Sequence, residues 1–320
     1  MNNKLNRPQF RSSPFETFSD LPNLDSAWTF SSDVLRLLSD AVTSVPDEVA
    51  CIAVSGSLAR MEAHAGSDLD LIVVLDDRHA DLRTPGSDIL SGIECRLTEA
   101  MATTGRVPLV RPKRSGIFSQ CASWKAMTNP QMRGVVDEDL TVFGHRMQLL
   151  LDAQPVSGFD RFEELQRDLL SWYAEHRVGA VFEYEGMLHW LRHDVLRYWH
   201  SLLARACWLY PDAPEQFLEV NVKWRSTRHI MTAGFLHALN AAETDAGDTE
   251  GSVIQRLTEL LWQTPAERLS AFLPETEARR LLTALDCVWL FLAGSGKASR
   301  QLPANVLSSI RWIQESVPLR

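Results

Sequence analysis

Two aspartates, Asp68 and Asp70, stand one residue apart directly before an apolar, β-branched run at 72–75. Side chains alternate along a strand, so the two carboxylates are predicted to share a face, about 7 Å apart along the strand. Carboxylates this close raise each other's pKa unless a cation lies between them. Divalent cations such as Mg²⁺ or Mn²⁺ prefer oxygen ligands of this kind. We therefore predict that Asp68 and Asp70 are metal ligands and catalytic residues.

A Gly-Ser corner, Gly56 and Ser57, ends the apolar strand predicted over 49–54. Gly56 has no Cβ, so a ligand can approach the backbone closely. The turn that follows is predicted to point N–H groups outward, which suits a phosphate. Two metal-binding aspartates beside a phosphate site are the arrangement for phosphoryl or nucleotidyl transfer. Taken alone, the same residues could also be an ordinary turn and a strand cap.

The complete stretch resembles the signature of the DNA polymerase β-like nucleotidyltransferase superfamily, closely over 50–76. That superfamily includes antibiotic nucleotidyltransferases, minimal toxin–antitoxin nucleotidyltransferases and uridylyltransferases that modify signalling proteins. A glycine often follows the arginine of the turn in the superfamily, whereas Met61 stands here. The residues that carry the resemblance are Gly56, Ser57, Arg60, Glu62, Ser67, Asp68 and Asp70.

The resemblance implies an enzyme that moves NMP from an NTP to an acceptor hydroxyl and releases pyrophosphate. It implies Mg²⁺ or Mn²⁺ as cofactor, ATP as the expected nucleotide, and a small molecule or a protein as acceptor. The nucleotide-binding residues implied in the first half are Gly56, Ser57, Arg60 and Ser67. The alternative is a catalytically impaired nucleotide sensor or partner-binding module on the same fold.

Four cations outside the signature are further candidates for nucleotide binding. Lys113 follows a predicted third strand and could neutralise a triphosphate, although a solvated turn is the alternative. Arg197, Lys223 and Arg228 lie on predicted helices of the second half. Trp224 and Arg228 are four residues apart and would share a helix face, which suits base stacking beside a phosphate contact. The alternative is a core tryptophan with an arginine that extends to solvent.

A third carboxylate usually completes the site in this superfamily, on a strand after the intervening helix. The matching stretches here, 107–111 and 116–119, contain no acid. We therefore predict that Asp68 and Asp70 are the only direct carboxylate ligands from the catalytic domain.

The elements around the site predict an α+β (α/β) nucleotidyltransferase domain with a small mixed sheet. Helical stripes at 34–42 and 89–101 flank the two strands, a strand at 107–110 and a return strand at 117–118 follow, and a helix covers 138–152. Beyond Gln154 the pattern is helical throughout, with one helix over 217–242 and three more after it. We expect an irregular arm at 1–26, the nucleotidyltransferase domain at 27–153 and an all-α helical-bundle domain at 154–320.

The composition is that of a soluble globular protein of 320 residues, with 45% hydrophobic and 23% charged residues. The formal net charge of -9 makes nucleic acid an unexpected partner. The five cysteines are scattered, and neither a signal peptide nor a membrane span is expected. These features predict a cytoplasmic protein.

Overall fold

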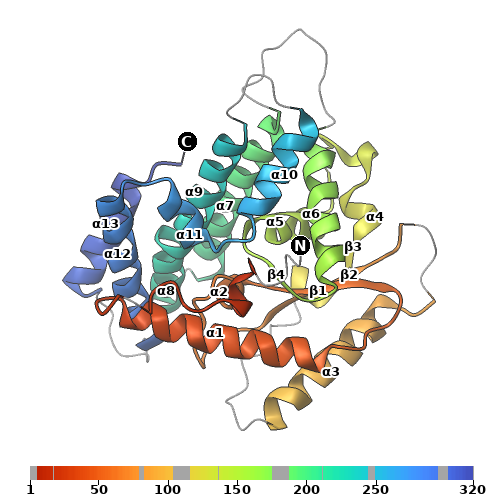
Figure 1. The fold of residues 1–320 in the computed structure, drawn as a ribbon, viewed down its shortest axis with the longest axis horizontal. Coiled ribbons are helices and arrows are strands. Elements are labelled where there is room, and N and C mark those ends of the chain that lie inside the picture. The colour runs from red at the N-terminus through yellow and green to blue at the C-terminus, as the bar shows by residue number, and fades with distance from the viewer. Residues whose placement is uncertain are drawn as a thin grey trace.

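The structure, a computed structural model, describes residues 6–16, 18–78, 83–103, 116–135, 137–174, 187–210, 212–243, 249–294 and 302–319. A small sheet lies beside long helices, and helices make up most of the second half (Figure 1). The strands are β1 (Val49–Ser55), β2 (Asp70–Leu75), β3 (Ala122–Ser123) and β4 (Gln154–Ser157).

The first half of the chain contains short helical turns between longer helices. These elements are η2 (Pro8–Phe10), α1 (Pro22–Ala41), α2 (Gly56–Ala59), α3 (Gly86–Thr103), η3 (Ile117–Ser119), α4 (Trp124–Met127), η4 (Pro130–Met132) and α5 (Leu140–Leu151). The second half adds α6 (Phe159–Ala174), α7 (His189–Leu209), α8 (Pro214–Arg225), α9 (Thr227–Ala242), α10 (Glu250–Leu260), α11 (Pro265–Ala271), α12 (Glu275–Gly294) and α13 (Ala304–Ser316).

The sheet is mixed, as predicted, with strand order β3-β2-β1-β4. The central strand β1 pairs antiparallel with both β2 and β4, and β2 pairs parallel with β3. In the β1–β2 register Ser55 lies opposite Asp70. The C-terminal end of β1 and the N-terminal end of β2 therefore lie side by side at the same end of the two inner strands, where the predicted site lies.

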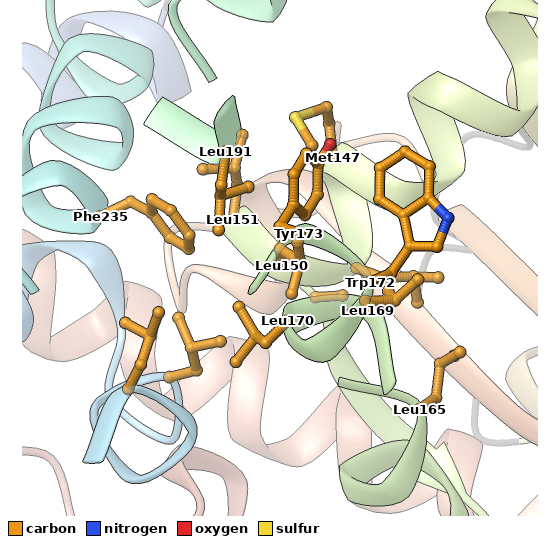
Figure 2. Packing of buried hydrophobic residues seen from close by; sticks show 14 of the residues in the cluster. Met147, Leu150, Leu151, Leu165, Leu169, Leu170, Trp172, Tyr173, Leu191 and Phe235 are labelled. Atoms are coloured by element: carbon orange, nitrogen blue, oxygen red, sulfur yellow. The ribbon is translucent and has the colours of Figure 1, made fainter. Parts of the chain in front are cut away.

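Both faces of β1 are buried, because alternate side chains enter different cores. Ile52 and Val54 lie in a core with residues of α1 and α3. Cys51 and Ala53 lie in a second core with residues of α5, α6, α9 and α10. Figure 2 shows part of this second core, where side chains of α5 and α6 meet Leu191 of α7 and Phe235 of α9. The helices of the second half thus pack directly against the sheet.

Two predictions for the first half are wrong in detail. Residues 117–118 form the short helix η3 rather than a return strand. Helix α1 begins at Pro22, inside the segment predicted to be an irregular arm, because a proline at the first helical position fits the helix. The predicted strand at 107–110 lies outside the described residues.

Two predictions for the second half also differ from the structure. β4 was not expected, yet Gln154 and Pro155 pair with β1 at the sheet edge, where a proline is tolerated. The single helix predicted over 217–242 is two helices, α8 and α9, separated at Ser226, whose φ is -122° and ψ is -89°. The Ser226 hydroxyl donates to the Val222 carbonyl at 2.6 Å, and serine side chains of this kind compete with helical hydrogen bonding. Four helices rather than three follow the loop after α9 in the described part of the chain.

No helix within the described residues is both long enough and apolar enough to cross a bilayer. The proposed boundary at residues 153 and 154 falls at the start of β4. The division into an arm and two domains remains a prediction.

Candidate active site

The corner between β1 and α2 is built around Gly56. Its φ is +72°, a backbone conformation that costs a non-glycine residue about 1–2 kcal/mol. A Cβ at this position would lie 2.4 Å from Oδ2 of Asp70. The backbone of Gly56 and the carboxylate of Asp70 are therefore in close proximity, and glycine is required both for the conformation and for the space.

The turn after α2 is closed by backbone hydrogen bonds and contains a second residue with positive φ. The Glu62 amide donates to the Ser57 carbonyl at 2.8 Å. Met61 has φ 60° and is buried in the core. Met61 occupies the position at which the superfamily often has glycine, and a left-handed backbone explains why glycine suits it.

Ser67 precedes the aspartate pair and holds its loop together. The Ser67 hydroxyl accepts from the His64 amide at 3.0 Å, and the Ser67 amide donates to the His64 carbonyl at 2.9 Å. Ser67 itself is buried, whereas Asp68 is exposed and Asp70 is partly buried. This loop fixes where the strand carrying the carboxylates begins.

Asp70 is electrostatically strained in the metal-free protein. Burial, and to a smaller extent the charges of Asp68 and Asp152, raise the pKa of Asp70 to about 6, against the opposing effects of Arg60 and Arg228. Asp68 and Asp70 therefore interact, as their spacing predicts. A cation placed between them would relieve this repulsion.

Arg60 is a buried ion-pair partner inside the corner. Its Nε donates to Glu62 at 2.9 Å and its Nη1 donates to Asp152 at 2.5 Å. Burial would lower the pKa of Arg60, but the two carboxylates outweigh burial and raise it. Arg60 therefore ties the turn after α2 to Asp152, the residue between α5 and β4.

Arg228, at the start of α9, interacts electrostatically with residues of the same site. It lies within electrostatic range of Asp70, Asp152, Tyr198 and Arg60. Burial lowers the pKa of Arg228, and the largest opposing effect, which raises it, comes from Tyr198. Its part in nucleotide binding remains a prediction.

Arg197 and Lys223 are paired at the surface. Arg197 lies 3.2 Å from Asp194, 3.7 Å from Glu138 and 3.9 Å above the Phe143 ring. Lys223 forms an ion pair with Glu219 at 2.6 Å. The charge of Lys223 reaches His64, so this lysine lies near the loop before the aspartate pair. Lys113 lies outside the described residues.

Trp224 does not offer a free face for a base. It stacks on Trp199 with ring centroids 4.3 Å apart, and its Nε1 donates to the Trp199 carbonyl at 3.1 Å. The Trp224 side chain is buried. The core interpretation of this tryptophan is therefore confirmed, whereas Arg228 interacts electrostatically with Asp70 and Asp152.

Four residues near the site, Ser55, Gln148, Asp152 and Tyr198, were not predicted from the sequence to be site residues. Asp152 follows a run of leucines at the end of α5, where an acid could equally well be solvated. The Ser55 hydroxyl donates to Gln148, and the Gln148 amide donates to the Tyr198 hydroxyl. This chain links the end of β1 to α5 and α7. Its members are separated by up to 143 residues in sequence, so no local pattern indicates it.

Within the described residues, no group of three or more His, Cys, Asp or Glu side chains is placed to hold a metal. Asp152 interacts with Asp70 but is held by Arg60. The prediction that Asp68 and Asp70 are the only direct carboxylate ligands remains a prediction.

Comparisons with known proteins address the first half of the chain. No curated protein and no solved structure matches the sequence significantly. A family model described as nucleotidyltransferase domain matches residues 35–99, the segment that includes β1, the Gly56 corner and β2. The resemblance seen in the Gly-Ser corner and the aspartate pair is thereby confirmed: residues 35–99 match a nucleotidyltransferase domain, which is consistent with the DNA polymerase β-like superfamily.

Proposed function

We propose that the protein is a metal-dependent nucleotidyltransferase that moves NMP from an NTP to an acceptor hydroxyl and releases pyrophosphate. The observation that carries the proposal is the contact between Gly56 and Asp70, where a Cβ would lie 2.4 Å from the carboxylate oxygen. A phosphate lying on the Gly56 backbone would be next to the Asp70 carboxylate, so nucleotide and metal ligands would share one site.

The donor set suits Mg²⁺ or Mn²⁺. Asp68 and Asp70 offer carboxylate oxygens, the ligands these ions prefer. Burial and, after it, repulsion from Asp68 raise the pKa of Asp70, and a bound cation would offset both effects. When bound, the ion would neutralise charge on the phosphates and stabilise the charge that develops during transfer.

The remaining contribution of the chain is positioning and charge. In the proposed reaction the acceptor oxygen forms a bond to the α-phosphorus, the bond from the α-phosphorus to the pyrophosphate oxygen breaks, and the hydroxyl proton is lost to solvent or a base. Gly56 and Ser57 would hold the phosphates, and Arg228 would contact their charge from α9. Arg60 and Ser67 would act by holding the corner, through Asp152 and His64.

The proposal extends to substrates and organisation. ATP is the proposed nucleotide, and a small molecule or a protein side chain is the proposed acceptor. The helical region would close one side of the site, since the charge of Arg228 on α9 lowers the pKa of Asp70. We also propose that Lys113, Arg197 and Lys223 bind the nucleotide.

The direct test is incubation with each NTP and Mg²⁺ or Mn²⁺, with pyrophosphate release and self-labelling as readouts. Asp68→Asn and Asp70→Asn should abolish transfer while the protein stays folded. Asp88→Asn, which changes an exposed aspartate in the first turn of α3, is the matched control and should keep wild-type activity. Normal turnover in both site variants would refute the proposed site. Nucleotide binding without pyrophosphate release would support the nucleotide-sensor alternative.

A further inference from the structure

A small hollow lies directly behind the corner, between the nucleotidyltransferase domain and α11. It is lined by Ala59 at the end of α2, Asp152 and Gln154 around the start of β4, and Gln263, Thr264 and Arg268 around the start of α11. Arg268 is 1% exposed, and its Nη2 donates to the Leu151 carbonyl at 2.5 Å. A cationic side chain of the helical region is thus buried next to the ion pair that holds the corner.

Several polar atoms of these lining residues have no hydrogen-bond partner within the described chain. They are Asp152 Oδ1, Gln154 Oε1, Gln263 Oε1, Arg268 Nε and Arg268 Nη1. The Gln154 amide nitrogen donates to the Ala59 carbonyl, so the Gln154 oxygen is assigned as an acceptor. A buried polar group without a partner costs about 1–3 kcal/mol, so five such atoms around one space indicate a ligand.

The chemistry of these atoms selects the ligand. Arg268 supplies donors, whereas Asp152, Gln154 and Gln263 supply acceptors. An anion would bind to Arg268 but would be repelled by Asp152, whereas a cation would bind to Asp152 but would be repelled by Arg268. A small neutral molecule that both donates and accepts satisfies both sets. The space is about the size of one water molecule, and buried waters typically make about three such bonds.

We propose that this hollow binds one ordered water that bridges Arg268 to Asp152, and that Arg268 is thereby a positioning residue for the nucleotidyl-transfer site. The functional half of this inference rests on the proposed function. Asp152 would be held on one side by Arg60, at 2.5 Å, and on the other by the water. Arg60 follows α2 directly, so the water would connect α11 to the turn that positions Gly56 and Asp70.

The charge of Arg268 is consistent with this role. Burial lowers its pKa to about 10, while Asp152 and Glu267 act in the opposite direction, so the guanidinium stays protonated at neutral pH. Arg268 therefore supplies fixed donors to the hollow under the conditions in which transfer would occur.

The first experiment is a high-resolution crystal structure of the full chain, with a second crystal soaked in bromide. We expect one water-sized density peak about 2.7–3.2 Å from Arg268 Nε or Nη1 and from Asp152 Oδ1, without anomalous bromide signal. An empty hollow, or bromide bound in it, would overturn the water site.

The second experiment measures kcat and KM for Arg268→Met, Asp152→Asn and the double variant. We expect Arg268→Met to lower kcat about tenfold with KM for the nucleotide nearly unchanged, because small displacements of reacting groups are costly. Since Arg268 acts through Asp152, the double variant should be no slower than the slower single variant. Arg268→Lys keeps the cation and should recover part of the lost kcat.

The control is Arg11→Met. Arg11 forms an ion pair at 2.9 Å with Glu267, the residue that precedes Arg268 in sequence. Arg11→Met should keep the wild-type kcat. If Arg268→Met does not fold, Gln263→Met removes one acceptor from the hollow and should lower kcat in the same non-additive way. Wild-type kcat in the hollow variants, or additive losses, would overturn the positioning role. An inactive wild type would instead refute the proposed function and the positioning role together, and the density would still decide the water site.

Discussion

Gly56 and Asp70 compete for the same space: a side chain at residue 56 would begin 2.4 Å from Oδ2 of the aspartate. A side chain at residue 56 would therefore displace the Asp70 carboxylate. The contact joins the two halves of the signature, the Gly-Ser corner and the aspartate pair, which are 14 residues apart in sequence. It also makes a direct experimental prediction.

Replacing Gly56 with alanine or valine should reduce nucleotide binding by at least about tenfold, since the Cβ displaces the Asp70 carboxylate and blocks close approach of the phosphates. The positive φ adds about 1–2 kcal/mol of destabilisation. Calorimetric titration with the nucleotide and thermal unfolding measure the two effects. Gly92→Ala, in open space on α3, is the control and should be neutral or slightly stabilising. Wild-type affinity in folded Gly56→Val would exclude the phosphate site.

In the metal-free protein, the contribution of Asp70 to stability should fall as the pH rises from about 4 to about 6. The pKa of Asp70 is raised from 3.8 to about 6 on folding, so the native state binds more protons than the unfolded state in this window. The free energy of unfolding therefore falls with pH, by at most about 3 kcal/mol from this group. Asp70→Asn should remove this part of the dependence in urea titrations. An identical pH dependence in the wild type and Asp70→Asn would contradict the assignment.

Arg60→Met should destabilise the protein by about 3–5 kcal/mol, because it leaves Glu62 and Asp152 buried without their shared cation. Urea unfolding measures the loss. Lys223→Gln breaks an ion pair whose side chains are 42% and 46% exposed, and should cost less than about 1 kcal/mol. Equal losses in the two variants would mean that the Arg60 pairs do not stabilise the corner.

Arg228→Gln should weaken nucleotide binding about tenfold or more with little effect on stability, since a charge-assisted hydrogen bond to phosphate is worth about 1.5–3 kcal/mol. Arg197→Gln is the comparison, because Arg197 is already paired with Asp194. Calorimetric titration of both variants with the nucleotide separates them. If Arg197→Gln weakens binding more than Arg228→Gln does, the phosphate contact lies on α7 rather than α9.

Met61 shows what a sequence pattern can indicate before its cause is known. It departs from the glycine often found at this position, and the structure gives it a φ of 60°. Its side chain is buried in the core with Leu58 and Ala63, so apolar burial offsets backbone strain of about 1–2 kcal/mol. The departure changes the local energetics of the turn while the left-handed backbone is kept.

The elements that the sequence alone determined are those encoded by local periodicity. Continuous apolar runs define β1 and β2, the lack of a Cβ defines the Gly56 corner, and the one-residue spacing defines the Asp68 and Asp70 pair. All three depend on residues within a few positions of one another, where steric preference and side-chain direction follow directly from the chain.

The surroundings of the site were decided by the tertiary structure. Asp152 directly precedes the segment where β4 pairs with β1, Arg228 lies just after the break between α8 and α9 at Ser226, and Arg268 of α11 donates to the Leu151 carbonyl. In sequence Asp152 is an acid at a helix end and Arg268 is a helical arginine, with no feature that distinguishes them from solvated side chains. Arg228 was a candidate because of its spacing from Trp224, but the sequence left open whether it extends to solvent. These three residues lie near Asp70 and Arg60 because segments more than 80 residues apart in sequence pack together. The free energy of that packing depends on the whole fold, so no local sequence pattern predicts it.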